Sequence, residues 1–368
     1  MKYCVHLTAP ITTTPKADNH RGEPRLERNI FDALITGNRT VHATNGIWLS
    51  QDPCPPNLCN GLNTDWLDDS TLISYGVPKS ISTGYFPVEA EQCKYKIIHY
   101  QDGPSHETKD TFLKFDRANP GSIVATTSFQ AWEYQSRLEK VLGKENVEWV
   151  YGPTVPFTVD TADNFNQPVL LWAYRNFCKY ADERPREMKM LFDWIAVQLY
   201  HEPNLRLVIL AQPNNESSKL ALQGDKLQWF LNFPFASSLK NKPDQVKVLT
   251  NIHWHEMLEI MKETRLIVSP AEPLGGPPFE AAMYGIPTVL ENGTNPFHDR
   301  NRQPLFPGLL TAPAGISNPW LEQIGRLFHD HDFYIKHGSA YRSFVKEHAT
   351  YQAYLNQIDA ISKKRGWM

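Results

Sequence analysis

Residues 263–293, with the sequence ETRLIVSPAEPLGGPPFEAAMYGIPTVLENG, decide the fold. A short, continuous apolar run, RLIVSP, leads into a Gly-Gly loop, and the helix-like run PPFEAAMYG follows. Short apolar strands between helices are typical of a parallel sheet that is buried on both faces. Pro277 and Pro278 suit the first turn of a helix, where a missing N–H costs little. The stretch therefore predicts a strand, a loop and a helix of an α/β protein.

The same alternation of strands and helices extends outward to both ends of the chain. We expect strands at 2–8, 40–44, 71–77, 94–100, 121–128, 147–151, 168–174, 205–211, 265–270 and 286–291. We expect helices at 25–37, 129–143, 187–200, 253–263 and 277–285, and from Pro319 to about Ser362, with Gly143 as a helix C-cap. Residues 45–70 are rich in Asn, Asp, Pro and Gly, which favours a long surface excursion over regular structure.

Composition restricts the class of protein. A chain of 368 residues with 41% hydrophobic positions is long enough for two cores. The formal net charge of -3 gives no global positive field, which argues against a general nucleic-acid binder. The five cysteines are scattered, without the spacing of a zinc site or a disulfide framework. With no signal peptide or membrane-spanning run, we expect a cytoplasmic protein.

The Pro-, Asp- and Asn-containing segment 152–167 lacks sustained periodicity and is the expected interdomain linker. We predict an N-terminal, acceptor-side domain over 1–157 and a C-terminal nucleotide-binding domain over 158–345. The last segment, 346–368, is expected to form a helix that packs back on the N-terminal domain.

Two carboxylates flank the Gly-Gly loop, with seven residues between them. Glu272 lies on the strand side of the loop and Glu280 just inside the helix, so each can accept hydrogen bonds from a separate set of hydroxyls. The loop offers backbone N–H groups at Leu274, Gly275 and Gly276. Ligands of parallel sheets bind at such strand ends, and an anion is stabilised at a helix N-terminus. Taken singly, each glutamate is as easily a solvated loop charge or a helix N-terminal carboxylate.

This arrangement resembles the retaining glycosyltransferases of family 4, whose signature is Glu, seven residues, Glu in the same strand, Gly-loop, helix context. The run Glu280-Ala-Ala-Met-Tyr-Gly-Ile-Pro287 follows that signature closely. The resemblance is strong over 246–293 and weaker over the rest of 85–365. It implies a GT-B architecture, with two Rossmann-like doubly wound domains facing across a cleft. It also implies a nucleotide-sugar donor, a UDP- or GDP-sugar, and no tightly bound cofactor.

The resemblance also implies roles for single residues. Glu272 would hold hydroxyls of the sugar, Leu274, Gly275 and Gly276 would meet the sugar and phosphate, and Glu280 would bind the ribose. A leaving diphosphate needs positive charge. Arg175 occupies the family's position for the first cation, while Lys179, Arg184 and Arg186 compete for the second. The alternative for all four is an ordinary solvated charge beside a helix.

The N-terminal half departs most from the family. Its phosphate-binding Gly loop has only Gly22 as a counterpart, and a family histidine has His99 as its nearest equivalent. A strand histidine satisfied by its neighbours is an equally good interpretation of His99. Asp330-His331-Asp332 has a metal-binding Asp-x-Asp form but lies between helical stretches, so we interpret it as a connection between helices.

The resemblance therefore implies a metal-independent glycosyltransferase that acts with retention of configuration. The acceptor stays open among glycan, lipid, protein and a modified base in DNA, and so does the oligomeric state. The excursion 45–70 is the expected place of acceptor recognition. Alternatives are a sugar epimerase or hydrolase on the same scaffold, and a non-catalytic protein that binds nucleotide sugars or glycans.

Overall fold

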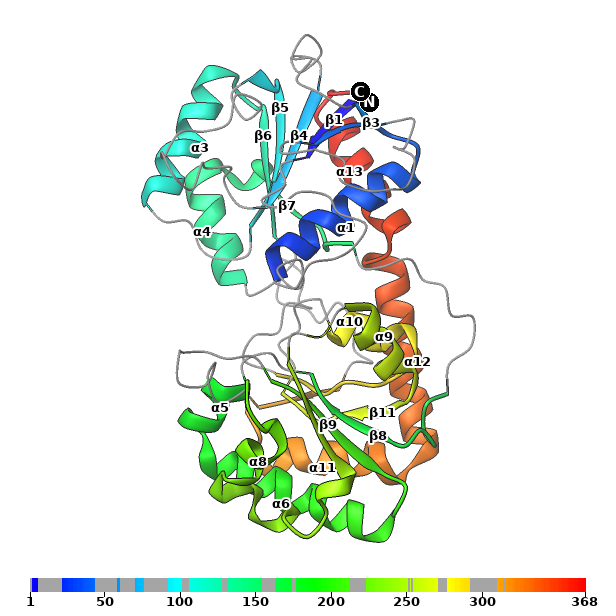
Figure 1. The fold of residues 1–368 in the computed structure, drawn as a ribbon. Coiled ribbons are helices and arrows are strands. Elements are labelled where there is room, and N and C mark those ends of the chain that lie inside the picture. The colour runs from blue at the N-terminus through cyan, green and yellow to red at the C-terminus, as the bar shows by residue number, and fades with distance from the viewer. Residues whose placement is uncertain are drawn as a thin grey trace. The chain divides into compact units, whose positions relative to one another are not determined.

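The computed structural model describes residues 2–5, 22–43, 58–59, 70–75, 92–100, 106–127, 132–153, 163–173, 177–211, 223–250, 252, 254–270, 277–291, 310–313 and 315–368 (Figure 1). The chain forms two compact units. Unit 1 comprises Met1–Phe157, Pro296–Leu305 and Lys346–Met368, and unit 2 comprises Thr158–Asn295 and Phe306–Val345. The assignment of domains to 1–157, 158–345 and 346–368 stays a prediction.

Unit 1 is built on a parallel sheet with the strand order β3-β2-β1-β4-β5-β6-β7. Its strands are β1 (Lys2–Val5), β2 (Thr40–Ala43), β3 (Leu58–Cys59), β4 (Ser70–Tyr75), β5 (Tyr95–Tyr100), β6 (Ile123–Thr127) and β7 (Val147–Trp149). The order reverses between β1 and β4, which is the mark of a doubly wound sheet. Strand β3 lies inside the segment that we expected to lack regular structure, and its pairing with β2 corrects that expectation.

Helices cover both faces of this sheet (Figure 1). They are α1 (Gly22–Thr36) and α13 (Tyr351–Lys364) on one face, and α3 (His106–Ala118) and α4 (Trp132–Leu142) on the other. Side chains alternate along each strand, so that Ile97 of β5 packs with the first pair of helices and Ile98 with the second. Helix α3 was not expected, because Phe112 and Phe115 give it only a narrow apolar stripe. The expected C-cap at Gly143 is confirmed by its φ of 86° after α4.

Unit 2 has a parallel sheet with the order β10-β9-β8-β11. Its strands are β8 (Val169–Trp172), β9 (Arg206–Leu210), β10 (Val246–Leu249) and β11 (Thr264–Ile267). Its α-helices are α5 (Phe177–Glu183), α6 (Pro185–His201), α8 (Lys226–Leu231), α9 (Trp254–Lys262), α10 (Pro277–Met283), α11 (Asn318–His329) and α12 (His331–His348), the last turn of which belongs to unit 1. Here too the order reverses, between β8 and β11.

The strand that we expected at 286–291 is shorter than predicted. Only β12 (Leu290–Glu291) is a strand, and it pairs in parallel with β13 (Thr311–Ala312) in a separate two-stranded sheet. Gly285 has a φ of 69° and Pro287 has no backbone N–H, so neither suits a regular ladder. The turn at Gly285 and Pro287 therefore accounts for the later start of β12, at Leu290.

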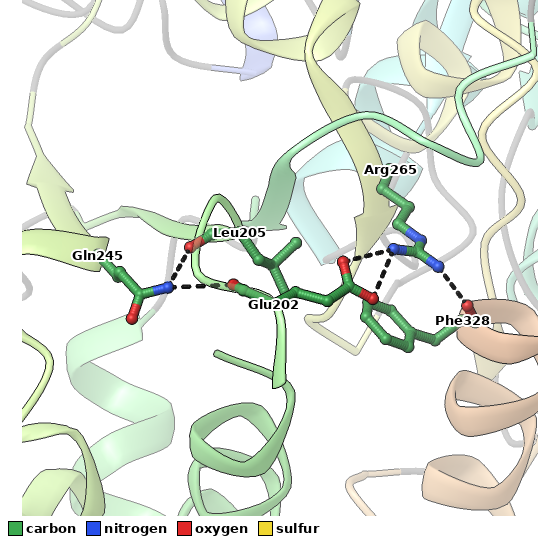
Figure 2. A network of polar contacts seen from close by, with 5 residues as sticks. All are labelled: Glu202, Leu205, Gln245, Arg265 and Phe328. Atoms are coloured by element: carbon green, nitrogen blue, oxygen red, sulfur yellow. Dashed lines mark hydrogen bonds and ion pairs between the residues drawn. The ribbon is translucent and has the colours of Figure 1, made fainter. Parts of the chain in front are cut away.

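A polar network holds the end of the unit 2 sheet at which β9 and β11 begin (Figure 2). The guanidinium of Arg265 donates to both carboxylate oxygens of Glu202, at 3.2 and 3.0 Å, and to the carbonyl of Phe328 at 2.6 Å. It also stacks on the Phe328 ring, 3.9 Å from the centroid. The amide of Gln245 donates to the carbonyls of Glu202 and Leu205, at 3.3 and 2.8 Å. This network joins β11 to the ends of α6 and α11.

Helix α13 is tied to the sheet of unit 1 by buried and partly buried polar contacts. The hydroxyl of Tyr3 donates to Asp359 at 3.3 Å, and Asp359 also pairs with Arg39. Nε2 of His99 lies 2.9 Å from the hydroxyl of Tyr354, and Nδ1 hydrogen-bonds the hydroxyl of Thr126. His99 is only 2% exposed, and burial lowers its pKa to about 3. The C-terminal helix therefore completes the core that begins at the first strand.

The buried His99 predicts that unit 1 loses stability in mild acid. An unfolded histidine binds a proton below pH ~6.5, whereas folded His99 stays neutral down to about pH 3. The unfolded state therefore takes up more protons in that window, and the free energy of unfolding should fall by ~2 kcal/mol between pH 7.5 and pH 5. Urea unfolding of wild type and His99→Gln at both pH values measures this fall in the free energy of unfolding. The fall should be ~2 kcal/mol smaller in the variant, which lacks the buried imidazole. Exposed His329→Gln is the control, and a pH dependence unaltered in His99→Gln would contradict the assignment.

Candidate functional site

The carboxyl ends of β8 and β11 meet at the reversal of strand order in unit 2. The ladder ends with the N–H of Val268 donating to the carbonyl of Leu171 at 2.9 Å. The next contact is made by a side chain, because the N–H of Ala173 donates to the hydroxyl of Ser269 at 3.2 Å. Reversals of this kind in parallel sheets are where ligands bind. Sequence analysis did not single out Ser269, although its place at the end of the RLIVSP strand was the available signal.

Helix α10 carries Glu280 in its first turn. Glu280 is 1% exposed, so its side chain is part of the packed interior of unit 2. The helix ends in a Schellman motif, with the N–H of Gly285 donating to the carbonyl of Ala282 at 3.0 Å and the N–H of Ile286 to that of Ala281 at 3.1 Å. This geometry explains the Gly-x-Pro spacing, because Gly285 supplies the positive φ and Pro287 stops the helix.

Helix α12 holds α10 in place. The guanidinium of Arg342 donates to the carbonyl of Met283, the last residue of α10, at 2.5 Å. The ring of Phe279 packs against Tyr341 and Phe344, with centroids 6.4 and 6.0 Å apart. A cation at the C-terminus of a helix is favoured by the helix dipole, as is a carboxylate near its N-terminus. Glu280 and Arg342 therefore both complement the dipole of α10, a helix of only seven residues.

Several predicted site residues lie outside the described residues: Arg175, Glu272, Leu274, Gly275 and Gly276. Their roles stay predictions. The described chain stops at Ala173, two residues before Arg175, and at Pro270, two residues before Glu272. Ala173 and Ser269 are hydrogen-bonded to each other. The described parts of the chain that precede Arg175 and Glu272 therefore end side by side, at the carboxyl ends of β8 and β11.

The three residues that compete for the second cation differ in their surroundings. Arg184 pairs with Glu187 at 3.1 Å and lies over the ring of Tyr180, 5.5 Å from its centroid. Arg186 is exposed at the start of α6. Lys179 lies in α5, and its side chain is outside the described residues. Arg184 is thus already engaged in structure, and the assignment of Lys179 or Arg186 stays a prediction.

The N-terminal candidates are also placed. Gly22 is the first residue of α1, and its contact with phosphate stays a prediction. The two ring nitrogens of His99 bond to hydroxyls within the core, which favours our second interpretation, a strand histidine satisfied by its neighbours.

Of the Asp-x-Asp sequence, which we interpreted as a connection between helices, only Asp330 lies between two helices, and His331 and Asp332 begin the second of them. Asp330 lies between α11 and α12, and its side chain accepts from the N–H of Phe333 at 3.0 Å. His331 hydrogen-bonds Asp163 at 2.9 Å. Across the described ranges, no group of three or more His, Cys, Asp or Glu side chains could hold a metal ion. Nor does any helix in that part of the chain have the length and apolar character needed to span a bilayer.

No protein-family model and no curated protein matches the sequence. Solved structures do match, over almost the whole chain. A glycosyltransferase from Rickettsia africae ESF-5 gives a TM-score of 0.58 at 11% identity, covering 99% of this chain and 98% of its own. HepE of Anabaena, in complex with UDP-glucose, gives 0.55 at 13% identity, covering 99% and 100%. WaaG, a glycosyltransferase involved in lipopolysaccharide biosynthesis, gives 0.54 at 11% identity, covering 98% and 99%.

The chain has the GT-B fold. This fold consists of two Rossmann-like domains, and the predicted fold class is confirmed. Units 1 and 2 each contain the doubly wound reversal of strand order that defines such a domain. In this GT-B chain, the motif that resembles family 4 belongs to unit 2 and follows the second strand of the β8 and β11 pair.

We predict opposite effects on stability for substitutions of two helical glycines, of which one lies at the contact between α12 and the turn after α10 and the other lies in α11. A Cβ at Gly338 would lie 2.1 Å from the carbonyl oxygen of Gly285, so Gly338→Ala should destabilise the protein by about 1–3 kcal/mol through overpacking. A Cβ at Gly325, inside α11, would have only Trp194 within reach, at 4.0 Å. Gly325→Ala should therefore stabilise by roughly 0.5–1 kcal/mol, the usual gain in a helix interior. Urea unfolding of both variants tests this, and a stabilising Gly338→Ala would contradict the close approach.

Proposed function

We propose that this protein is a retaining glycosyltransferase that moves a sugar from a UDP- or GDP-sugar to an acceptor. The observation that carries the proposal is the reversal of strand order between β8 and β11, from which the chain continues to the Glu-x7-Glu motif. Support comes from the fold, because glycosyltransferases share it and one of them, HepE, was solved with UDP-glucose. The acceptor class is left open among glycan, lipid, protein and modified nucleobase.

The proposed division of roles follows the motif. Glu272 binds sugar hydroxyls, the amides of Leu274, Gly275 and Gly276 meet the sugar and phosphate, and Glu280 binds the ribose. The proposed role of Glu280 is supported by its place in the first turn of α10, the helix that follows the Gly-Gly loop. Gly22 is proposed to contact phosphate from unit 1.

The leaving diphosphate is proposed to be stabilised by protein cations rather than by a metal. Arg175 takes the first position, with Lys179 or Arg186 in the second. Charge that develops on a leaving group is stabilised most by groups already fixed in place. The phosphate oxygen that departs takes the acceptor proton, so no separate protein base is needed in this scheme. Transfer should therefore continue after exhaustive chelation.

A panel of UDP- and GDP-sugars tests the proposal with wild-type protein. A sugar nucleotide that binds only the folded state raises the melting temperature. At a concentration of ~100 Kd it adds ~2.7 kcal/mol to the free energy of unfolding. Each stabilising compound is then incubated with acceptors of the four classes, and both nucleotide release and sugar transfer are measured in EDTA. Release without transfer would favour an epimerase or hydrolase, and binding without release a non-catalytic protein.

Glu280→Gln should weaken binding of the sugar donor. We choose Gln because Glu280 is buried, so that Ala, the obvious truncation, would also open a cavity. Loss of a hydrogen bond to a charged group costs about 1.5–3 kcal/mol, which is roughly a 10- to 100-fold loss in affinity. Isothermal titration with the stabilising nucleotide sugar measures it. The exposed Glu322→Gln is the matched control, and equal affinities in the two variants would remove Glu280 from the site.

Arg175→Ala should act mainly on turnover. A fixed charge that stabilises a developing anion is worth roughly 2.7–4 kcal/mol, so kcat should fall ~100-fold or more. Arg175→Lys should restore only part of it, since a point charge lacks the bidentate fork. Initial rates at saturating sugar donor are compared with those of Arg206→Ala, which loses an exposed pair with Glu263. Wild-type turnover in Arg175→Ala would transfer the role to Lys179 or Arg186.

A further inference from the structure

We propose that Ser269 is a positioning residue, whose hydroxyl holds the end of β8 against the end of β11 and so sets the spacing of the segments that carry Arg175 and Glu272. The expected effect on turnover rests on the proposed function. The contact between Ser269 and Ala173 does not, because both residues are among those that the structure describes.

The contact lies where backbone pairing between the two strands gives way to a side chain. Leu171 pairs with Ile267, and Val268 still donates to the carbonyl of Leu171. One step further, the N–H of Ala173 donates to the Ser269 hydroxyl instead. Ala173 is 7% exposed and Ser269 is 3% exposed, so little water competes for this bond.

A buried bond of this kind has a defined geometric effect. Removal of the Ser269 hydroxyl leaves a buried N–H at Ala173 without its acceptor, which is energetically costly. The backbone at the end of β8 is then expected to shift so that this N–H reaches another acceptor. Arg175 follows Ala173 by two residues, and Glu272 follows Ser269 by three. A shift at the strand ends therefore changes how the proposed cation and the proposed sugar ligand meet one substrate. Displacements of ~1 Å in such groups can lower a rate ~100-fold.

Strand β11 offers a matched control at its other end. The hydroxyl of Thr264 is also buried and donates to the carbonyl of Ile260 at 2.8 Å. Thr264→Val removes one buried hydroxyl bond from the same strand but leaves the β8 contact intact. Thr264→Val is expected to lower the melting temperature less than Ser269→Ala, because the carbonyl of Ile260 still accepts from the N–H of Glu263 at 3.1 Å. Ser269→Thr keeps the hydroxyl and serves as the conservative variant.

The experiment measures kcat and the KM for the sugar donor in wild type and the three variants. Ser269→Ala should lower kcat up to ~100-fold with a smaller change in KM. Thr264→Val should retain the wild-type kcat, and Ser269→Thr should restore most of it. Equal kcat values in Ser269→Ala and Thr264→Val would overturn the proposal, because the hydroxyl would then serve stability alone.

Hydrogen exchange separates failure of this proposal from failure of the proposed function. Peptides covering 168–178 should exchange faster in Ser269→Ala than in wild type, whereas Thr264→Val should leave them unchanged. If wild type transfers no sugar from any nucleotide, the proposed function fails, and exchange alone then decides whether Ser269 holds the strand ends. Unchanged exchange of these peptides in Ser269→Ala would overturn the positioning role in either case.

Discussion

The pairing of β8 with β11 is the constraint on which the proposed site depends. The fourth strand of unit 2, β11, lies beside the first, β8, and right-handed connections on the two sides of such a reversal run over opposite faces of a sheet. Helix α5 then packs with the main core of unit 2, while α10 packs with α12. Backbone groups at the ends of both strands are left to find partners in side chains, of which Ser269 is the described example. The proposed site therefore depends on topology first and on particular residues second.

Local patterns in the sequence predicted much of this architecture because the relevant signals are short in range. The apolar run before Ser269, the prolines at the start of α10 and the glycine after α4 each act within a few residues. Long-range partners carry no such signal. His99 lies 255 residues from Tyr354, so its pattern as a strand histidine could not distinguish a ligand from a core residue. Helix α3 was missed for a related reason, since two phenylalanines are too few to reveal its period.

Unit 1 depends on both ends of the chain. Strand β1 is among the first residues and α13 among the last, and Tyr3, Tyr354 and Ile358 lie in one core cluster. The N-terminal and C-terminal labels accordingly lie side by side in Figure 1. This core cannot be completed until the last helix is present, because α13 supplies one side of its apolar cluster and the partner of His99. A buried polar contact adds specificity to that docking, since an unmatched hydroxyl or imidazole there would be costly.

Helix α10 shows how a weak local element becomes a precise one. Seven residues are too few for a stable helix in isolation, so its geometry must come from tertiary contacts. Those contacts are supplied by α12, through Arg342 at the last carbonyl, the aromatic packing of Phe279 and the close approach at Gly338. Helix α10, which carries Glu280, is therefore held by residues some sixty positions away in the sequence, as the bond between Arg342 and Met283 illustrates with a separation of 59. The motif supplies Glu280, but the placement of the helix that carries it depends on α12, which lies outside the motif.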